Sequence, residues 1–420
     1  MIPLSGSASV LCVLLICALP FALAGLALIY AGFSGARNTS QVLIGSLSLA
    51  AVAAVIYYAI GFAWQSYPGG VSYAMQFGST TWDWIGAQKL FFHSLDWNGT
   101  AACFIAGSQI FAVGIAAVIP WGACLGRWRI SAAAVSTVLL AGLIYPLFAH
   151  WVWGGGWLAH LGVGFNLGGG FVDPGGAATI QVIGALFALS VLWLMGSRTG
   201  QPEISTEPGG AVHQEIYMLA GCLLAFIGWL ALNALGAVLF AGLTSVSLVP
   251  VVINTLLCAS GSLFIALLVA RLRFGKSDAA LCAKAWLAGL VASSAVAAYV
   301  KPFSAIVVGA IAGIIALSAE WLLREFCDLD DPAGAVAIHG VAGLWGLFAL
   351  GMFSNLPPGQ TLAQLVGIGT LIGLMLPIIY GVNWLLDRKL IHFSTGSEDQ
   401  PPAPQQPSSV KHGTDLVTGT

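Results

Sequence analysis

Long uncharged stretches constrain this chain more than any other feature of its sequence. Charged residues make up 7% of its 420 positions and hydrophobic residues 58%, whereas a soluble domain carries roughly 25% charged residues. A bilayer core is crossed by about 20 helical residues. The sequence therefore predicts an all-α, polytopic membrane protein with eleven transmembrane helices. The predicted spans cover residues 9–33, 40–64, 99–124, 131–152, 174–197, 214–241, 247–270, 281–299, 302–323, 332–354 and 362–386.

The distribution of Lys and Arg predicts the topology. With the N-terminus placed outside, the outer loops carry only Lys89 and Lys301, while the inner loops and the tail carry twelve basic residues. This bias favours an N-out, C-in orientation and an odd number of spans. The first stretch is too long for a signal-peptide core and no charge precedes it, so we expect a spanning helix. The inner set is Arg37, Arg127, Arg129, Arg198, Arg271, Arg273, Lys276, Lys284, Arg324, Arg388, Lys389 and Lys411.

A short internal repeat is the most informative local pattern. Asp173 begins DPGGAATIQ and Asp331 begins DPAGAVAIH, with five of nine positions identical. In each segment Asp suits the N-cap of a helix and Pro its first turn, because Pro has no N–H to leave unpaired. The two helices are the fifth and tenth spans, so they enter from opposite faces. This predicts two inverted five-helix repeats with a functional site at their interface.

The repeat places two polar side chains near the middle of the membrane. Gln181 and His339 each lie eight residues past their Asp, which is about 12 Å along a helix. Entering a core about 30 Å thick from opposite faces, they differ by only about 6 Å in depth. We therefore predict that Gln181 and His339 line a pore.

Each candidate site residue also has a structural interpretation. His339 is the only His placed deep in a span, where an ionisable group is by default a functional hypothesis, but a neutral His can also join helices by hydrogen bonds. Gln181 can likewise join two helices by a hydrogen bond. Asp173 caps its helix and also favours an arriving cation by its charge. Trp153, in HWVWGGGW, serves either as an interfacial anchor or as a cation–π site.

The predicted membrane domain covers residues 1–392. We expect the first repeat at about 9–197, the second at about 214–354 and the eleventh helix at about 362–386. Residues 393–420 are rich in Pro, Ser, Gln and Thr, which predicts a disordered cytoplasmic tail.

Several classes of function are not expected. A net charge of -2 gives no reason to predict a nucleic-acid partner. The eight Cys residues are scattered through apolar stretches without a CxxC pair, so no metal site or disulfide framework is indicated. No nucleophile–base set is visible. We expect no cofactor and no enzymatic activity.

A series of motifs resembles the ammonium transporter/Rhesus family over roughly residues 10–390. HWVWGGGW at His150–Trp157 and the segment from Asp330-Asp-Pro to Ile338-His-Gly-Val are the most specific of them. The others are Tyr30-Ala-Gly with Arg37-Asn38, Gly122-Ala-Cys-Leu-Gly-Arg127, Ile227-Gly-Trp-Leu-Ala-Leu-Asn233 and Asn254-Thr255.

The resemblance implies a homotrimer in the cell (inner) membrane, with one pore per subunit. It implies an outer vestibule that recruits ammonium, an aromatic gate and a narrow pore with two facing histidines, where the ion loses its proton before crossing. By this resemblance Trp153, Asp173 and Asn233 belong to the vestibule, Gln109 matches the third-span glutamine, and His339 matches the second pore histidine.

This chain departs from the family pattern at its pore. The first pore histidine is Gln181. The two gate phenylalanines fall on Ala112 and Leu232, although a one-residue shift offers Phe111, and the vestibule serine falls on Gly236. The loop between Trp153 and Asp173 carries about eight extra residues, including Gly168–Gly170. The tail has no clear match to the family's regulatory segment, so a cytoplasmic signalling partner is not expected.

Three hypotheses follow. The first is a transporter or channel for ammonium or ammonia with altered pore residues. The second is a non-transporting ammonium sensor or scaffold, because several pore positions have changed. The third is a channel for another small amine or neutral solute, because the gate residues are small. Under each hypothesis the lipid bilayer surrounds the protein.

Overall fold

The computed structural model describes residues 4–35, 38–77, 80–196 and 210–393. Within these ranges eleven helices are long and apolar enough to cross a membrane, which confirms the predicted number. In chain order the spans are α1–α2 (Gly6–Ala18, Pro20–Phe33), α3–η1–α4 (Thr39–Ile56, Tyr57–Gly61, Phe62–Gln65), α5 (Ala101–Ala123), α6–η3–α7 (Ile130–Leu139, Leu140–Ile144, Tyr145–Trp153), η4–α9 (Ala177–Val182, Ile183–Met195), α10 (Gly210–Leu239), α11 (Val249–Phe274), α12 (Ala279–Val296), α13 (Pro302–Cys327), η6–α14 (Val336–Val341, Ala342–Phe353) and α15–η7–α16 (Gln360–Thr370, Leu371–Met375, Leu376–Lys389).

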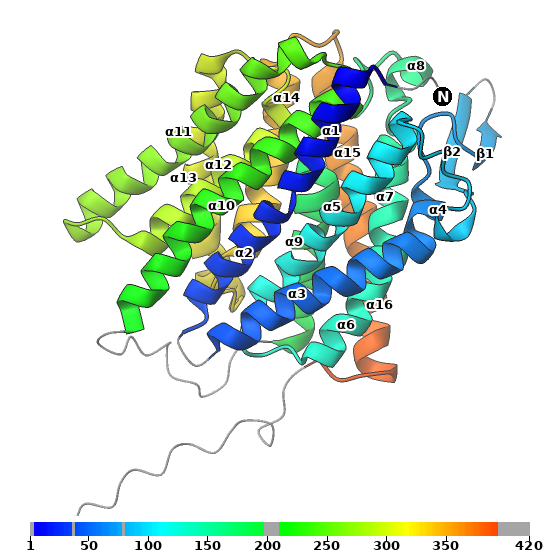
Figure 1. Cartoon of the computed structure of the whole chain (residues 1–420). Helices are drawn as coiled ribbons and strands as arrows, with labels where there is room; N and C mark the ends of the chain where they lie inside the picture. Colours follow the sequence, from blue (N-terminus) through cyan, green and yellow to red (C-terminus); the bar gives the residue numbers. More distant parts are fainter. Residues whose placement is uncertain (1–3, 36–37, 78–79, 197–209, 394–420) are drawn as a thin grey trace, which may run out of the picture.

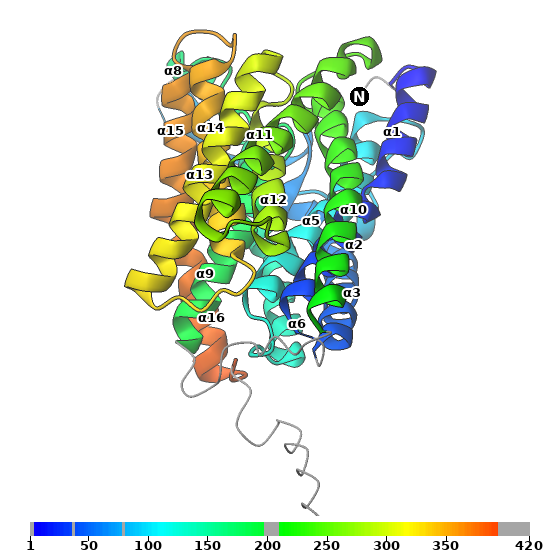
Figure 2. The same cartoon turned by 90° about the vertical axis from the view of Figure 1, so that its left-hand side faces the viewer.

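The helices form a tilted bundle with the N-terminus near one end, which we call the upper end (Figure 1). The opposite end is the lower end. Figure 2 shows α8 (Leu161–Phe165), α14 and α15 at the upper end, and α16 at the lower end. The short helices η2 (Leu90–Phe92) and η5 (Ser245–Leu248) complete the described helical elements.

The two Asp-Pro helices cross at the centre of the bundle. α9 packs against η6, and α14 packs against η4, so the fifth and tenth spans are antiparallel. The carboxylate of Asp173 accepts the backbone N–H of Thr179 at 2.9 Å, and that of Asp331 accepts the N–H of Val336 at 2.8 Å. Both carboxylates therefore satisfy N–H groups of the first helical turn, as a cap does. The prediction that Pro occupies the first helical position is wrong, because the helices begin at Ala177 and Val336 and each Pro lies in the turn before.

Five of the described spans contain a π-helical segment. Such segments widen the helix locally and are frequent at functional sites. Two of them, η4 and η6, contain Gln181 and His339 respectively. The sequence pattern predicts ordinary α-helix for both stretches.

A β-hairpin at the upper end was not anticipated from the sequence. β1 (Ser72–Phe77) and β2 (Thr80–Gly86) pair antiparallel between the second and third spans (Figure 1). Asp83 Oδ1 of β2 lies 3.0 Å from Nε2 of the buried His150 in α7. His150 Nδ1 lies 2.8 Å from the carbonyl oxygen of Gln65, so the ring joins the hairpin and α4 to α7.

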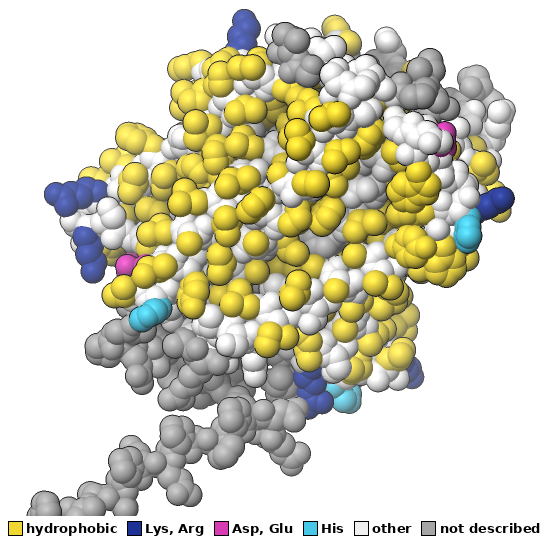
Figure 3. Space-filling model, in the orientation of Figure 1, with side chains coloured by type: hydrophobic (Ala, Val, Ile, Leu, Met, Phe, Trp, Pro, Cys, Tyr) yellow, Lys and Arg dark blue, Asp and Glu magenta, His cyan; other side chains and the backbone are white. Residues whose placement is uncertain are grey.

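The outer surface is suited to lipid. Figure 3 shows hydrophobic side chains across the broad middle of one face, with Lys, Arg, Asp and Glu at its margins. Leu47, Phe264 and Phe303 are each at least 66% exposed. A surface of this kind is stable only when lipid or another apolar surface covers it.

Two expectations stay predictions. They are the inverted repeats over residues 9–197 and 214–354 and the N-out, C-in orientation. The predicted tail from 394 onward lies outside the described residues, as do Arg37, Arg198 and Lys411. The described spans otherwise follow the predicted ranges, with ends that shift by a few residues.

Candidate functional site

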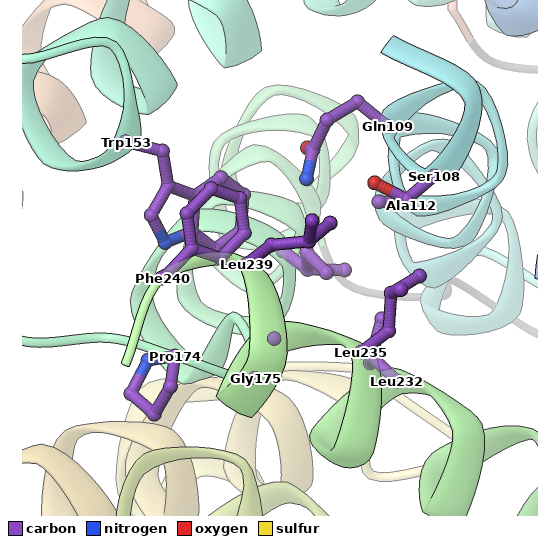
Figure 4. Close-up of a pocket in the computed structure, with 12 residues that line it drawn as sticks. Ser108, Gln109, Ala112, Trp153, Pro174, Gly175, Leu232, Leu235, Leu239 and Phe240 are labelled. Atoms are coloured by element: carbon purple, nitrogen blue, oxygen red, sulfur yellow. The ribbon is translucent and has the colours of Figure 1, made fainter. Parts of the chain in front are cut away.

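A pocket lies between the third, fifth and sixth spans, beside the end of the fourth. Figure 4 shows Trp153 and Phe240 on one side of it and residues of α5 on the other. Apart from Ser108 and Gln109, its side chains are apolar. Its lining consists of Ser108, Gln109, Ala112, Trp153, Pro174, Gly175, Ile180, Leu232, Leu235, Gly236, Leu239 and Phe240.

Trp153 ends α7 and borders this pocket. Its indole Nε1 donates to the backbone oxygen of Asp173 at 2.8 Å. The ring of Phe240 stacks on it at a centroid distance of 4.8 Å and an interplanar angle of 7°. Phe240 therefore fixes the plane of Trp153 and covers one of its faces, leaving the other for a cation or an apolar solute.

Asp173 stands just before η4 with one carboxylate oxygen fully used. Its Oδ2 accepts from the N–H groups of Ala178 and Thr179 and from the Thr179 hydroxyl, at 2.9 to 3.1 Å. Its Oδ1 is buried and has no hydrogen-bond partner among the described residues. Burial raises the pKa of this carboxyl to about 6, although the hydrogen bonds from Thr179 and Ala178 oppose the shift. At neutral pH the carboxyl therefore carries a negative charge.

The gate positions are apolar and small. Ala112 and Leu232 line the pocket, whereas Phe111, the alternative considered from the sequence, packs on the hydrophobic core and does not line it. Gly236 also lines the pocket. A Cβ atom on Gly236 would lie 1.9 Å from the carbonyl oxygen of Pro174, so the serine of the family pattern does not fit here without moving that loop.

Asn233 does not line the pocket. Its Nδ2 donates to the hydroxyl oxygens of Thr255 and Ser293, both at 2.9 Å, and thereby ties α10 to α11 and α12. Its Oδ1 has no partner among the described residues and lies so close to Gly175 that a Cβ there would approach it to 2.3 Å. Asn233 therefore packs against the turn formed by Asp173–Gly176.

Gln181 and His339 meet at the crossing of the two Asp-Pro helices. His339 Nδ1 lies 2.7 Å from Gln181 Oε1, and His339 Nε2 lies 3.0 Å from the hydroxyl of Tyr30. Both side chains are fully buried, and Tyr30 is nearly so. Ile180, the residue before Gln181, lines the pocket above, so pocket and pair are neighbours along one helix.

The partners of His339 restrict its hydrogen positions. An amide oxygen only accepts, so Nδ1 carries a hydrogen, whereas the Tyr30 hydroxyl can donate to Nε2 or accept from it. Both ring nitrogens are engaged, and the imidazole is neutral when the Tyr30 hydroxyl donates. The remaining group is Gln181 Nε2, which is buried without a partner among the described residues. The pair thus presents one unused hydrogen-bond donor.

The lower end has a different character. Lys284 and Glu320 form an ion pair, and Arg127 Nη1 lies 2.9 Å from Asp330 Oδ2. Burial raises the pKa of the Asp331 carboxyl to about 7, with the hydrogen bonds from Val336 and Ala335 and the charge of Lys284 opposing it. Charges of both signs therefore surround the second Asp-Pro turn.

Sequence reasoning missed two residues of this site. Tyr30 was noted only as part of the Tyr-Ala-Gly motif, and nothing in that motif says that its hydroxyl reaches His339, 309 positions away. Phe240 lies at the end of an apolar span, where an aromatic residue has no distinguishing pattern. In both cases the partner lies on another helix, so only the tertiary structure identifies it.

Comparison with known proteins agrees with this architecture. A model of the Ammonium Transporter Family matches residues 10–386. Ammonium transporter Amt2 of Archaeoglobus fulgidus is 33% identical over 344 residues, which cover 80% of this chain and 69% of the relative. An ammonium transporter of Bacillus subtilis is 28% identical over 333 residues, covering 79% and 76% respectively.

Solved structures show the same fold. A structure described as a Sensor Amt Protein superposes with a TM-score of 0.79 at 24% identity, covering 93% of this chain and 95% of that one. Mep2 of Candida albicans gives a TM-score of 0.76 at 19% identity, covering 92% and 86%. At such identities the likeness establishes the fold and nothing further.

Proposed function

This chain belongs to the ammonium transporter family, and we propose that it carries ammonium across the membrane from the pocket beside Trp153 to the pair Gln181–His339. The observation that carries the proposal is that pair itself. A buried hydrogen-bonded chain of Tyr30, His339 and Gln181 links α2, η6 and η4, and Ile180, the residue before Gln181, lines the pocket. Members of the family are transporters, not enzymes.

The vestibule suits the cation. Asp173 supplies a negative charge, and the ring of Trp153, which lines the pocket, attracts cations by its quadrupole. The carbonyl turn Pro174–Gly175 and the side chains of Ser108 and Gln109 add polar groups. We expect ammonium to be captured here in its charged form.

The midpoint suits ammonia better than the ion. Ammonium has four N–H donors and no lone pair, whereas the group that the pair leaves without a partner is a donor, Gln181 Nε2, and Gln181 Oε1 already accepts from His339. Ammonia has a lone pair that this N–H can reach. An intact cation in a dry, apolar passage also carries a large desolvation cost. We therefore propose that the nitrogen passes His339 as ammonia.

The changed gate favours one extension of the substrate range. Ala112 and Leu232 leave more room than two phenylalanines, so a methylated amine is a second candidate solute. Competition of a series of amines with ammonium would measure the size limit. A non-transporting sensor is not favoured, because the sequence relatives from Archaeoglobus fulgidus and Bacillus subtilis are named ammonium transporters, and the structure described as a Sensor Amt Protein supports the fold alone.

Orientation, location and assembly are also proposals. The lower-end loops hold nine of the eleven Lys and Arg residues in the described ranges, which supports a cytoplasmic lower end. We propose a homotrimer in the cell (inner) membrane, as the family resemblance implies, with the mass of the purified complex as the test.

Transport is tested on purified protein in liposomes after an ammonium concentration jump. Electrical current and internal pH are recorded together, because ammonia entry alone makes the interior alkaline without a current. We expect a signal in the wild type that falls to the protein-free level in His339→Leu. Asn383→Leu is the matched control, since it removes a buried amide that donates to Ser190 away from the pathway. Wild-type liposomes that match protein-free ones in both readouts would contradict the proposal.

A further inference from the structure

The inserted loop between Trp153 and Asp173 is held by two buried glutamines of the eleventh span. Gln360 begins α15, and its Oε1 accepts the N–H of Gly169 at 2.9 Å while its Nε2 donates to the oxygen of Gly170 at 2.9 Å. Gln364, one turn further, accepts the N–H of Val172 and donates to the oxygen of the same residue, both at 2.9 Å.

The two amides behave like a neighbouring β-strand. Each uses its oxygen and its nitrogen on the backbone of the loop, as a strand residue does with its partner. Gln360 Nε2 also donates to Gln364 Oε1 at 3.2 Å. Neither glutamine is more than 3% exposed, and neither leaves a side-chain atom without a partner. A fully satisfied pair of buried amides fixes geometry rather than merely filling space.

The glycines of the inserted loop leave room for this close contact with α15. Gly168 and Gly170 have positive φ angles of 53° and 82°. A Cβ on Gly168 would lie 2.5 Å from Gln360 Oε1, so a side chain there would displace the amide. The ring of Phe171 fits against Gly367 of α15, where a Cβ would approach it to 2.1 Å.

The contact between α15 and the inserted loop extends to Asp173, the charged residue of the vestibule. The oxygen of Val172 belongs to the peptide plane that leads into Asp173, so Gln364 fixes that plane directly. The next plane contains the Asp173 oxygen, which accepts from Trp153 Nε1 at 2.8 Å. Asp173 is thus held on both sides of its Cα. Those two contacts, with the bonds to Oδ2, set where the unpartnered Oδ1 points.

We propose that Gln360 and Gln364 are positioning residues for cation recognition, which act by fixing the backbone of Asp173. This rests on the proposed transport function and adds to it a role for the eleventh span. Neither glutamine touches the solute. Their effect reaches it through the carboxylate of Asp173 and the indole of Trp153.

The test compares ammonium transport by purified wild-type protein and Gln364→Met in liposomes over a range of ammonium concentrations. Methionine keeps the length of the side chain but makes neither bond to Val172. We expect the half-saturating ammonium concentration to rise about five-fold, the size of one neutral hydrogen bond, with the maximal rate within about two-fold. Gln360→Met, further from Asp173, should act in the same direction and less, and it replaces Gln364→Met if that variant does not fold.

Two comparisons separate positioning from a general loss of stability. Thr361→Val is the control, because Thr361 lies between the glutamines but donates to the oxygen of Gly351 on α14, at 2.7 Å. In an Asp173→Asn background, Gln364→Met should raise half-saturation by less than about two-fold, since the effect passes through that carboxylate. Equal behaviour of Gln364→Met and Thr361→Val, or full additivity with Asp173→Asn, would overturn the positioning role alone. Absence of wild-type transport would overturn the proposed function and this inference together.

Discussion

The two Asp-Pro turns begin alike in sequence and lie in opposite electrostatic surroundings. Each carboxylate caps its helix through Oδ2 and leaves Oδ1 without a partner among the described residues. The indole of Trp153 donates to the backbone of Asp173, and among the described residues no basic side chain is bonded to its carboxylate. Near Asp331 lie the ions of Lys284 and Glu320. The same capping motif thus yields a carboxyl without a bonded cation at the upper end and one beside an ion pair at the lower end.

The midpoint shows a second asymmetry within the same repeat. Gln181 occupies the position that corresponds to His339, and an amide does not change charge between pH 5 and 8 as an imidazole does. The two side chains still bond to each other at 2.7 Å. The two similar segments therefore place their side chains alike. The charge of those side chains and their ability to take up a proton nevertheless differ between the segments.

The largest effect should come from neutralising each carboxyl separately. Asparagine keeps an oxygen for the helix cap but removes the charge. We expect Asp173→Asn to lower the uptake rate at limiting ammonium at least about ten-fold, the size of a lost interaction with a charged group. Asp331→Asn should lower it less than about three-fold, because burial keeps part of that carboxyl protonated near neutral pH and Lys284 offsets part of its charge. Uptake into liposomes measures both, and equal losses would show that the two ends are electrostatically equivalent.

The pH dependence sharpens the same contrast. The pKa of Asp173 is raised to about 6, so its carboxyl is charged above that pH and neutral below it. Uptake at limiting ammonium should therefore fall as pH is lowered from 7 to 5. The free ammonia concentration also changes with pH, so the quantity to plot is the ratio of wild type to Asp173→Asn. That ratio should approach one below pH 6, and a ratio that stays constant would exclude Asp173 as the titrating group.

How far the sequence alone predicts this molecule depends on how local each feature is. Helix length and the Asp-Pro caps are local, and the eleven spans are confirmed. The sequence pairs Gln181 with His339 because each lies eight residues past the Asp that begins its segment, which gives both the same depth along their helices. Tyr30, Phe240, Gln360 and Gln364 act across helices, and single apolar or amide residues in a span carry no signal of their partner. The π-helical turns that hold the pair likewise depend on packing.

The lower end should contribute more to stability than to recognition. Arg127 binds Asp330 at 2.9 Å and donates to the oxygens of Met195 and Gly196, which lie at the end of α9. Arg127→Met should lower the free energy of unfolding by about 1–2 kcal/mol, since hydrogen bonds to charged groups at a partly buried site are lost. Half-saturation should not change.

Thermal unfolding in detergent checks the loss of stability against Arg273→Met, which removes an equal charge from the exposed end of α11. A changed half-saturation in Arg127→Met, with stability intact, would assign the lower end to solute recognition instead.

The smallest expected effect concerns the aromatic side of the vestibule. Phe240 stacks on Trp153 at 4.8 Å, and such a pair contributes about 0.5–1.5 kcal/mol beyond its buried area. Phe240→Leu leaves the indole bonded to Asp173 but removes the ring that holds its plane. We therefore expect half-saturation by ammonium to rise about three-fold while the midpoint of the pH profile stays where Asp173 places it. Phe226→Leu is the control, because Phe226 lies on α10, the helix that precedes Phe240, and meets Trp286 edge-on at 5.6 Å. A Phe240→Leu variant that shifts the pH midpoint instead would mean that the aromatic stack sets the environment of the carboxylate, and the upper end would then recognise the cation as one coupled unit.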